Sequence, residues 1–544
     1  MKIVFKYVKV KIMLFFPRLL VCFSLLAINS SYANENIKVD LPDQFFSHEF
    51  EVLLMTKSLE NDALTKFYAK RLFKPFWYGE NKRIIEFKKV VDKSSDHGLP
   101  ESKYNFLEKS KNKSVYEFEI LTMESFISLI SDLNSGILKP NEIDPKISVY
   151  PKKINREEVL GKLEKLIINN RSIDDLVFEY APNDLEYRKL LNELARLRDV
   201  IVNNEWGEPV PEDKFLGYKL NHSHVAKLRT RLFGMGYLAY DNGSNLYDEE
   251  VKSAVQLFQA DHGLNDDGVA GNYTLQAMNV SPKTRLTQVL VNLERIRWSD
   301  FSTEPKYVMV NQPNFHAYLI EDDMVVWKSR VVIGLPEHQT QEFSDIMTHL
   351  IINPVWHVPR SISISEYLPI IQENPEFLKE NDMSLIVRGT DQKIDPSLID
   401  MSKFEPNNFP FLIKQNPSNI NALGVVKFMF PNEFNIYMHD TPMKELFFKD
   451  ERTFSHGCVR VQDPFQFAFN LLGYQELNPE EKFQKFLQTK QESQINLIEP
   501  IPVNLVYRTV FFGDYGQPQY RSDIYGRDAA VFMALQDAGV IAQI

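Results

Sequence analysis

The 544-residue chain contains two cysteines, and the second stands among residues suited to nucleophilic chemistry. Its surroundings are Ser455-His456-Gly457-Cys458-Val459-Arg460. A cysteine attacks as its thiolate, and neighbouring cations favour the thiolate over the thiol. An arbitrary cysteine is more often a small buried core residue. The glycine and the two basic residue types around Cys458 favour a nucleophile instead.

A thiol nucleophile also needs a base and a group that orients the base. His439 ends a strand-like run, Ile436 to His439, that lies nineteen residues before Cys458. A strand end followed by a loop of that length can return the chain to the same place. We therefore expect His439 to be the general acid/base, with His456 as the secondary candidate. Asp440 is expected to orient His439 through its main-chain carbonyl or its carboxylate.

The remaining candidates concern the oxyanion and the substrate. The Gly457–Cys458 turn is expected to offer main-chain N–H groups to an oxyanion, because glycine allows close approach. Arg460 is a candidate to bind a substrate carboxylate or to brace the turn. Three more candidates for substrate contact are Ser455, Tyr437 and Trp356. For the two aromatic side chains, core packing is an equally good interpretation. No metal site and no cofactor is predicted.

Residues 1–33 have the pattern of an export signal. Basic residues precede the mostly apolar stretch from Met13 to Ile28, and small residues precede a cleavage site after Ala33. If the segment stays uncleaved, it becomes an inner-membrane anchor. Because Cys22 lies in this segment, we expect a periplasmic mature chain that holds one thiol.

The charge balance excludes some classes of partner. The formal net charge is −11. Residues 1–33 hold five cations and no acids, so their removal makes the net charge −16. Nucleic acids and anionic lipids require basic surface, so neither is expected as the main partner.

The chain is long enough for several domains, and the texture of the sequence changes along it. Apolar residues first recur at helical spacing, then three short amphipathic helices follow, and β-rich runs begin near residue 306. The predicted fold is multidomain α+β. The expected divisions are a helical scaffold (34–215), a three-helix module (222–279), a connecting helix (280–305), a mostly-β domain (306–485) and a C-terminal segment packing on the β-domain and scaffold (486–544).

The β pattern lapses between about 360 and 424, where the sequence becomes helical and rich in proline and asparagine. A stretch of that length inside a compact domain is usually a lid or a binding loop. We therefore expect a helical capping insertion in the β-domain.

The candidate residues resemble the L,D-transpeptidases of the YkuD type. That family has His-x-Thr followed by Ser/Thr-His-Gly-Cys-hydrophobic-Arg, and 455–460 meet every position of the second part. The common family form has glycine after the first histidine, where Asp440 stands here. Residues 222–279 resemble the three-helix peptidoglycan-binding domain of wall enzymes. The order of domains, with a long insertion, resembles the YcbB branch.

The resemblance implies an acyltransferase that forms 3→3 peptidoglycan cross-links. Cys458 would attack a tetrapeptide stem, release D-Ala and form a thioester, which the amine of a second stem would resolve. The implied partners are donor and acceptor tetrapeptide stems, carbapenem inhibitors and other wall-synthesis enzymes. Two alternatives remain open, namely a cysteine hydrolase of wall peptides and a non-catalytic peptidoglycan-binding scaffold.

Overall fold

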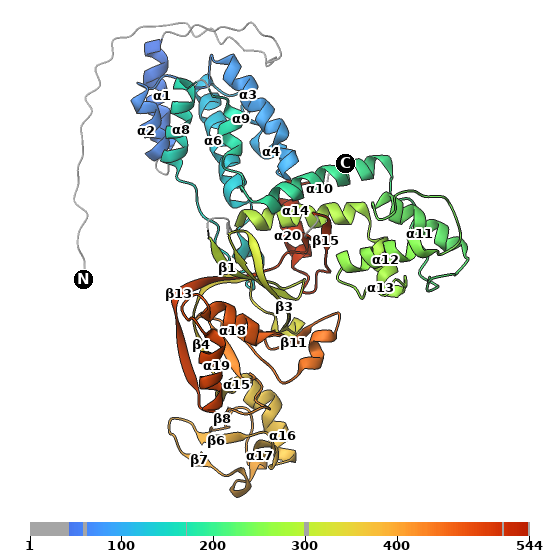
Figure 1. Ribbon diagram of the computed structural model, residues 1–544. Helices are drawn as coiled ribbons and strands as arrows, with labels where there is room; N and C mark the ends of the chain where they lie inside the picture. The colour runs from blue at the N-terminus through green and yellow to red at the C-terminus, as the bar shows by residue number, and fades with distance from the viewer. Residues whose placement is uncertain (1–42, 58–61, 170, 299–303, 514–515, 542–544) are drawn as a thin grey trace, which may run out of the picture.

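The computed structural model describes residues 43–57, 62–169, 171–298, 304–513 and 516–541. The expected signal segment 1–33, with Cys22, lies outside these residues. No helix in the described ranges has the length and apolar character needed to span a membrane. The multidomain α+β prediction is confirmed, because helices dominate the N-terminal half and a mostly-β domain follows residue 304 (Figure 1).

The N-terminal region is a helical bundle around an aromatic core. Its longest helix, α6, begins with a capping box in which Ser114 and Glu117 satisfy each other's main-chain N–H groups. The helix carries the buried Glu119, whose carboxylate accepts hydrogen bonds from the hydroxyl of Tyr68 and from three main-chain N–H groups. The helices are α1 (Asp43–Lys57), α2 (Asp62–Lys70), α3 (Asn81–Asp92), α4 (Glu101–Tyr104), α5 (Phe106–Lys109), α6 (Val115–Ser135), α7 (Pro140–Ile143), α8 (Arg156–Ile168), α9 (Ile173–Phe178) and α10 (Leu185–Asn203).

A small three-helix module follows and projects from the side of the molecule (Figure 1). Asp248 caps the second of its helices by accepting from Val251 N at 3.1 Å. The three helices share one apolar core. They are α11 (Ser223–Gly234), α12 (Glu249–Asp261) and α13 (Asn272–Asn279).

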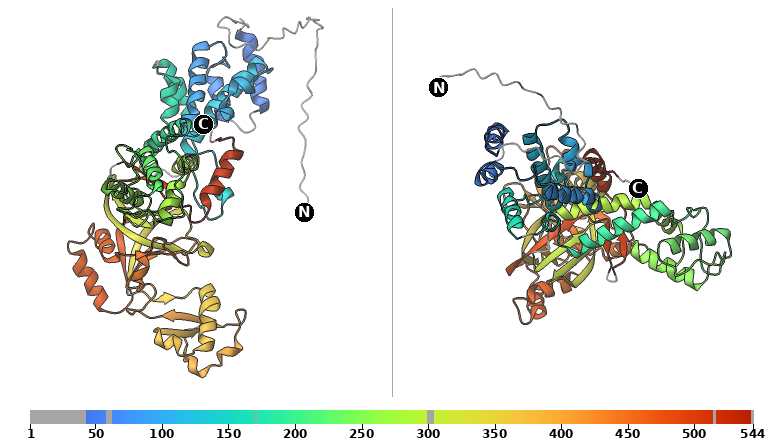
Figure 2. Two further views of the ribbon diagram at one scale, coloured as in Figure 1. Left: turned by 90° about the vertical axis from the view of Figure 1, so that its right-hand side faces the viewer. Right: turned by 90° about the horizontal axis from the view of Figure 1, so that it is seen from above.

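Helix α14 (Pro282–Trp298) joins the regions. It packs against α10, against the C-terminal helix α20 (Arg527–Asp537) and against β14 (Val510–Phe512). Its last three turns are buried on all sides. Figure 2 shows that the helical bundle and the β-domain lie on opposite sides of this helix.

The β-domain is built on one sheet that closes on itself. Its strand order is β11-β3-β12-β10-β9-β4-β13-β1-β2, and β2 also pairs with β3. Valine, isoleucine and phenylalanine side chains from these strands fill the interior together with helix α18. The elements are β1 (Lys306–Asn311), β2 (His316–Glu321), β3 (Met324–Gly334), β4 (Phe343–Ile352), β9 (Val426–Met429), β10 (Met438–His439), β11 (Thr453–Ser455), β12 (Val459–Val461), β13 (Ser493–Val506), α18 (Pro464–Leu472) and α19 (Pro479–Gln488).

The insertion between β4 and β9 is not the helical cap that we expected. It has an apolar core of its own and a four-stranded sheet in the order β5-β8-β6-β7. Short helical turns cover that sheet, and the unit extends below the β-domain in Figure 1. Its elements are β5 (Trp356–His357), α15 (Arg360–Ile362), a π-helical turn (Ser363–Tyr367), α16 (Leu368–Glu373), α17 (Phe377–Glu380), β6 (Met383–Val387), β7 (Lys393–Ile394) and β8 (Phe411–Gln415).

The boundary expected at residue 485 is also wrong. Strand β13 begins at Ser493 and lies between β1 and β4, so the sheet cannot close without it. The β-domain therefore extends to residue 506. Only the chain after it, with β14, β15 (Pro518–Tyr520) and α20, packs towards the helices.

Candidate active site

Strand pairing brings the predicted nucleophile and base together. β10 and β12 run parallel, with Met438 opposite Val459 and His439 opposite Arg460. Met438 and Val459 point into the barrel core, and side chains alternate along a strand. His439 and Arg460 therefore lie on the outer face of the barrel. Cys458 directly precedes Val459 and lies two positions before Arg460, so by alternation it is on the same outer face as Arg460 and His439.

The sulfur of Cys458 lies in a polar but partly enclosed place. The side chain is half-buried, and its thiol donates to the main-chain oxygen of Asn435 at 3.7 Å. Burial raises the pKa of Cys458 to about 11, although the main-chain and side-chain donors of Tyr437 and the positive charges of Arg460 and Lys427 act to lower it. The thiol is therefore protonated at neutral pH.

His439 is held as a neutral imidazole. It is 4% exposed, and its Nδ1 donates to the main-chain oxygen of Asp440 at 2.5 Å. Burial lowers the pKa of His439 to about 3, with a further contribution from Arg460. Because Nδ1 carries the proton for a carbonyl acceptor, Nε2 has the free lone pair. That nitrogen is the atom able to accept a proton from a thiol.

Asp440 orients the base through its main-chain carbonyl, which was one of the two alternatives left open by the sequence. Its carboxylate is engaged elsewhere, with Lys444 Nζ at 2.5 Å and with the main-chain N–H of Val425 at 2.9 Å. The side chain thus fastens the turn that leads into β9.

The turn before Cys458 is organised by Ser455. Its hydroxyl donates to the Cys458 main-chain oxygen at 2.6 Å and accepts from Gly457 N at 3.1 Å. Ser455 is therefore a buried part of the turn and not a substrate ligand. Because the Gly457 N–H already donates to the Ser455 hydroxyl, it is not free to donate to an oxyanion as the sequence predicted. Within the described residues the main-chain N–H of Cys458 donates to no protein acceptor, which leaves it available.

Gly457 still has a structural reason to be glycine. Its φ of +110° lies where residues with a Cβ are strained. Its carbonyl accepts from Thr340 Oγ1 at 2.8 Å, which ties the turn to the loop after β3.

Two other candidates lie against the insertion. His456 Nε2 is 2.6 Å from Glu366 Oε1, and its ring lies 4.8 Å from that of His338. Trp356 is 8% exposed and packs in the apolar core of the insertion, edge-on to Tyr367. The core-packing interpretation therefore holds for Trp356. The imidazole of His456 is held by Glu366 of the insertion, which makes His456 a weaker candidate for the base than His439.

Tyr437 and Arg460 stay beside the sulfur. The Tyr437 ring lies 5.6 Å from that of His439, and Tyr437 and Cys458 are close enough that each shifts the pKa of the other. Arg460 Nη1 contacts Met443 Sδ at 3.6 Å, whereas its buried Nε has no partner among the described residues. A guanidinium in this state has donors left for a ligand.

Sequence reasoning missed Lys427, which lies on β9 and pairs directly with His439 of β10. The signal was present in the alternation of Val426-Lys427-Phe428, because a charged residue between two core residues must face the outside of the barrel.

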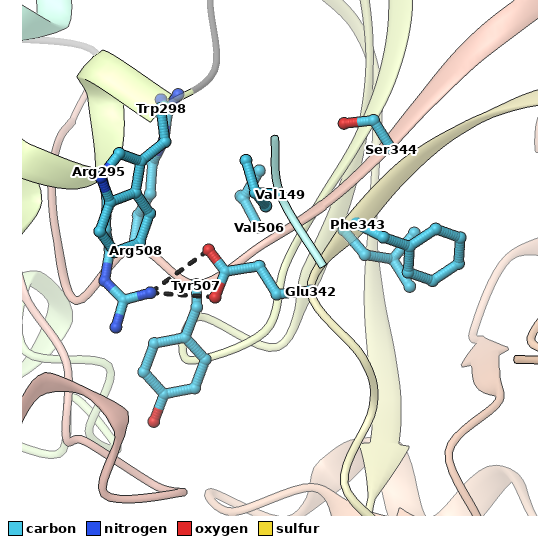
Figure 3. A pocket seen from close by; sticks show the side chains of 10 residues that line it. Val149, Arg295, Trp298, Glu342, Phe343, Ser344, Val506, Tyr507 and Arg508 are labelled. Carbon is cyan, nitrogen blue, oxygen red and sulfur yellow. Dashed lines mark hydrogen bonds and ion pairs between the residues drawn. The ribbon is translucent and has the colours of Figure 1, made fainter. Parts of the chain in front are cut away.

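One small pocket lies away from this site, where α14 meets the β-domain (Figure 3). Glu342 lies in it and forms an ion pair with Arg295 at 3.0 Å. Arg295 also pairs with Asp528 of α20, so this pocket belongs to a structural network.

Comparison with known families identifies the domain that contains Cys458. The YkuD family, described as the L,D-transpeptidase catalytic domain, matches residues 305–478. This part of the chain is an L,D-transpeptidase catalytic domain. The family described as "Scaffold domain" matches residues 62–194, and the "Putative peptidoglycan binding domain" matches residues 221–278. The protein therefore combines an L,D-transpeptidase domain with a peptidoglycan-binding domain.

Individual relatives were found as well. A Haemophilus influenzae protein named "Putative L,D-transpeptidase" is 30% identical over 259 residues, which cover 47% of this chain and 51% of that protein. The chain thus spans about half the length of this relative.

Two solved structures are more distant. L,D-transpeptidases from Stackebrandtia nassauensis and Xylanimonas cellulosilytica are each 14% identical, with TM-scores of 0.20 and 0.16. Each match covers 55% of this chain, and 97% and 100% of the respective solved chains.

Proposed function

We propose that the protein is an exported L,D-transpeptidase that joins two peptidoglycan stems by a 3→3 cross-link through a thioester on Cys458. One observation carries the proposal. On the strand next to Cys458, His439 is fixed by Asp440 with its Nε2 lone pair free. A neutral thiol beside a neutral, oriented imidazole suits acyl transfer, because the proton moves only when the carbonyl is attacked.

In the acylation step, His439 Nε2 takes the thiol proton as Cys458 Sγ attacks a carbonyl carbon. This carbonyl joins the diamino acid at position three of the donor stem to D-Ala. The main-chain N–H of Cys458 is placed to donate to the oxyanion. When the C–N bond breaks, the imidazolium gives its proton to the leaving amine. D-Ala departs and a thioester remains.

In the transfer step, the side-chain amine of a second stem's diamino acid attacks the thioester. His439 accepts the proton that the amine loses and returns it to the departing sulfur. A new amide joins the two third residues, and the free thiol is restored. By the same chemistry, the strained carbonyl of a carbapenem would acylate Cys458.

The insertion is proposed to keep water from the thioester, because excluding water favours attack by the amine over hydrolysis. The contact of Glu366 with His456 supports this role, since it joins the insertion to the turn that carries the nucleophile. Removing residues 360–424 should raise the share of hydrolysed product. An unchanged ratio of transfer to hydrolysis would refute the role.

The module at 221–278 is proposed to hold the enzyme on the wall. Peptidoglycan lies outside the cytoplasm, so this substrate agrees with the export pattern of residues 1–33 and with a periplasmic location. Other wall-synthesis enzymes are natural partners, because the donor must first be trimmed to a tetrapeptide.

Incubation with purified tetrapeptide muropeptides tests the proposal. We expect new dimers and free D-Ala with the wild type, and neither with Cys458→Ala. Shortened monomers without dimers would show a hydrolase instead. Wall binding with no product in either protein would show a scaffold.

A further inference from the structure

Lys427 is a second cation on the face that carries the catalytic pair. It pairs directly with His439 across β9 and β10 and with Ile351 across β9 and β4. Paired residues share a face of the sheet, so Lys427 lies on the same outer face as His439. Its neighbours Val426 and Phe428 are buried in the barrel core.

The side chain of Lys427 leans towards the nucleophile. Its Nζ lies 5.9 Å from the ring centroid of Tyr437, a residue close enough to Cys458 that each shifts the pKa of the other. Lys427 and Cys458 are close enough that each affects the ionisation of the other, which supports the same placement.

Apart from the Tyr437 ring, the ammonium group has no hydrogen-bond or ion-pair partner in the part of the chain that the structure describes. Lys427 is half-buried, yet among the described residues its ammonium contacts the ring of Tyr437 and makes no hydrogen bond or ion pair. Glu492, whose negative charge acts to raise the pKa of Lys427, accepts from Val355 N at 2.6 Å and forms no ion pair with Lys427. A half-enclosed ammonium without a counter-charge is costly unless a ligand supplies one.

The cationic surroundings make an anion the fitting ligand. The unpartnered Nε of Arg460 lies on the same face, so two cations flank the thiol. Wall stems carry carboxylates at two positions near the scissile bond, on the terminal D-Ala and on the diamino acid. The D-Ala carboxylate is on the carbon bonded to the scissile nitrogen and so lies close to Sγ during acylation, whereas five carbons separate the other carboxylate from the scissile carbonyl.

We propose that Lys427 binds a substrate carboxylate beside Cys458 and so selects acidic stems over their amidated forms. This inference deepens the proposed function and rests on it for the identity of the substrate. The subsite itself depends only on the charge and position of Lys427.

Alkylation of Cys458 tests the subsite without any wall substrate. Iodoacetate carries a carboxylate, whereas iodoacetamide is its neutral analogue. In both reactions the thiolate sulfur displaces iodide, and the new C–S bond is scored at the Cys458 peptide by mass. The ratio of the two rates cancels any change in the pKa of the thiol.

We expect Lys427→Met to lower the iodoacetate-to-iodoacetamide ratio about tenfold, the loss typical of one charge-assisted hydrogen bond. Lys427→Arg should keep most of the ratio. Lys414→Met is the matched control, because Lys414 lies on β8 of the insertion, and its ratio should equal that of the wild type. An unchanged ratio in folded Lys427→Met, with an unaltered melting temperature, would overturn the proposal.

A kinetic experiment then identifies the source of the carboxylate. Lys427→Met should raise KM for an acidic donor tetrapeptide with little change in kcat. If the donor's Lys427-binding carboxylate is amidated, wild type and Lys427→Met should have the same KM. If the donor's other carboxylate is amidated, the KM of Lys427→Met should still be higher than that of the wild type. If no stem peptide reacts while the alkylation ratio still depends on Lys427, the subsite stands and the transpeptidase function fails. Equal KM values for acidic and amidated donors in the wild type would overturn the proposed selection.

Discussion

Cys458 and His439 are both uncharged at rest. The pKa of the thiol is raised to about 11 and that of the imidazole is lowered to about 3, in both cases mainly by burial. This differs from an ion-pair site, where a thiolate exists before substrate arrives. The enclosure that raises the thiol pKa also strengthens hydrogen bonds to the oxyanion.

The raised pKa predicts the pH dependence of thiol reactivity. Only the thiolate reacts with iodoacetamide, so its rate at Cys458 should keep rising between pH 8 and pH 10. In denaturant the rise should end near the ordinary thiol pKa of 9.0. A plateau near pH 7 in the folded protein would show a resting thiolate and contradict the neutral pair.

The two histidines are predicted to differ in their effect on acylation. His439→Ala removes the proton acceptor and should slow acylation about 10²–10⁴-fold. His456→Ala removes a contact with the insertion and should have a far smaller effect. The rate of acyl-enzyme formation from a tetrapeptide measures both. The opposite order would make His456 the base.

At the scale of elements, the turn into β9 packs so closely against the Asp440 side chain that it needs glycine at 424. Gly424 has a φ of +60°, and a Cβ there would lie 2.2 Å from Asp440 Oδ2. Both the backbone conformation and the space therefore require glycine at 424 while aspartate follows His439.

This matching predicts a coupling between the two positions. Gly424→Ala should destabilise the protein by about 1–3 kcal/mol, because it adds a clash to the strain of a left-handed alanine. In an Asp440→Gly background the clash is absent, so the cost should fall to about 1 kcal/mol. Thermal unfolding of the four proteins measures the difference. Equal costs in both backgrounds would contradict the matching.

The sequence predicted the proximity of Cys458 and His439 better than it predicted the elements around them. The turn around Cys458 is one contiguous motif, and His439 lies at the end of a recognisable strand run. The side-chain role of Ser455 and the occupied N–H of Gly457 could not be predicted, because they depend on hydrogen bonds within the turn.

The missed strands have physical reasons. In β13, Pro500 falls between Asn496 and Ile501, where the pairing register with β4 shifts, so a bulge accommodates the proline. Because proline is rare in interior strands, its presence led the sequence analysis to overlook β13. In the insertion, β6 and β8 are short and pair across a long loop, and such non-local pairing leaves no periodic signal.

At the scale of the whole molecule, a buried charge network joins α14 to its neighbours. Arg295 is paired with Glu342, which directly precedes β4, and with Asp528 of α20. These three side chains link segments that are far apart in the sequence (Figure 3 shows the pair with Glu342).

Breaking this network should be costly. Arg295→Met leaves Asp528 without its ion-pair partner and Glu342 with only the longer pair to Arg527 at 3.8 Å, and we expect a loss of about 3–5 kcal/mol. Lys88→Met, which breaks an exposed pair with Asp92, is the control and should cost less than about 1 kcal/mol. Denaturant unfolding followed by circular dichroism compares them. Similar midpoints for the two variants would show that the network does not hold the regions together.

The central claim is that Cys458 carries the acyl group. The most direct measurement is the intact mass of the protein during reaction with a tetrapeptide stem, followed by peptide mapping. We predict an adduct equal to the stem without its D-Ala, located on Cys458 and absent from Cys458→Ala. D-Ala release and dimer formation with no adduct on Cys458, or with full activity in Cys458→Ala, would contradict the account.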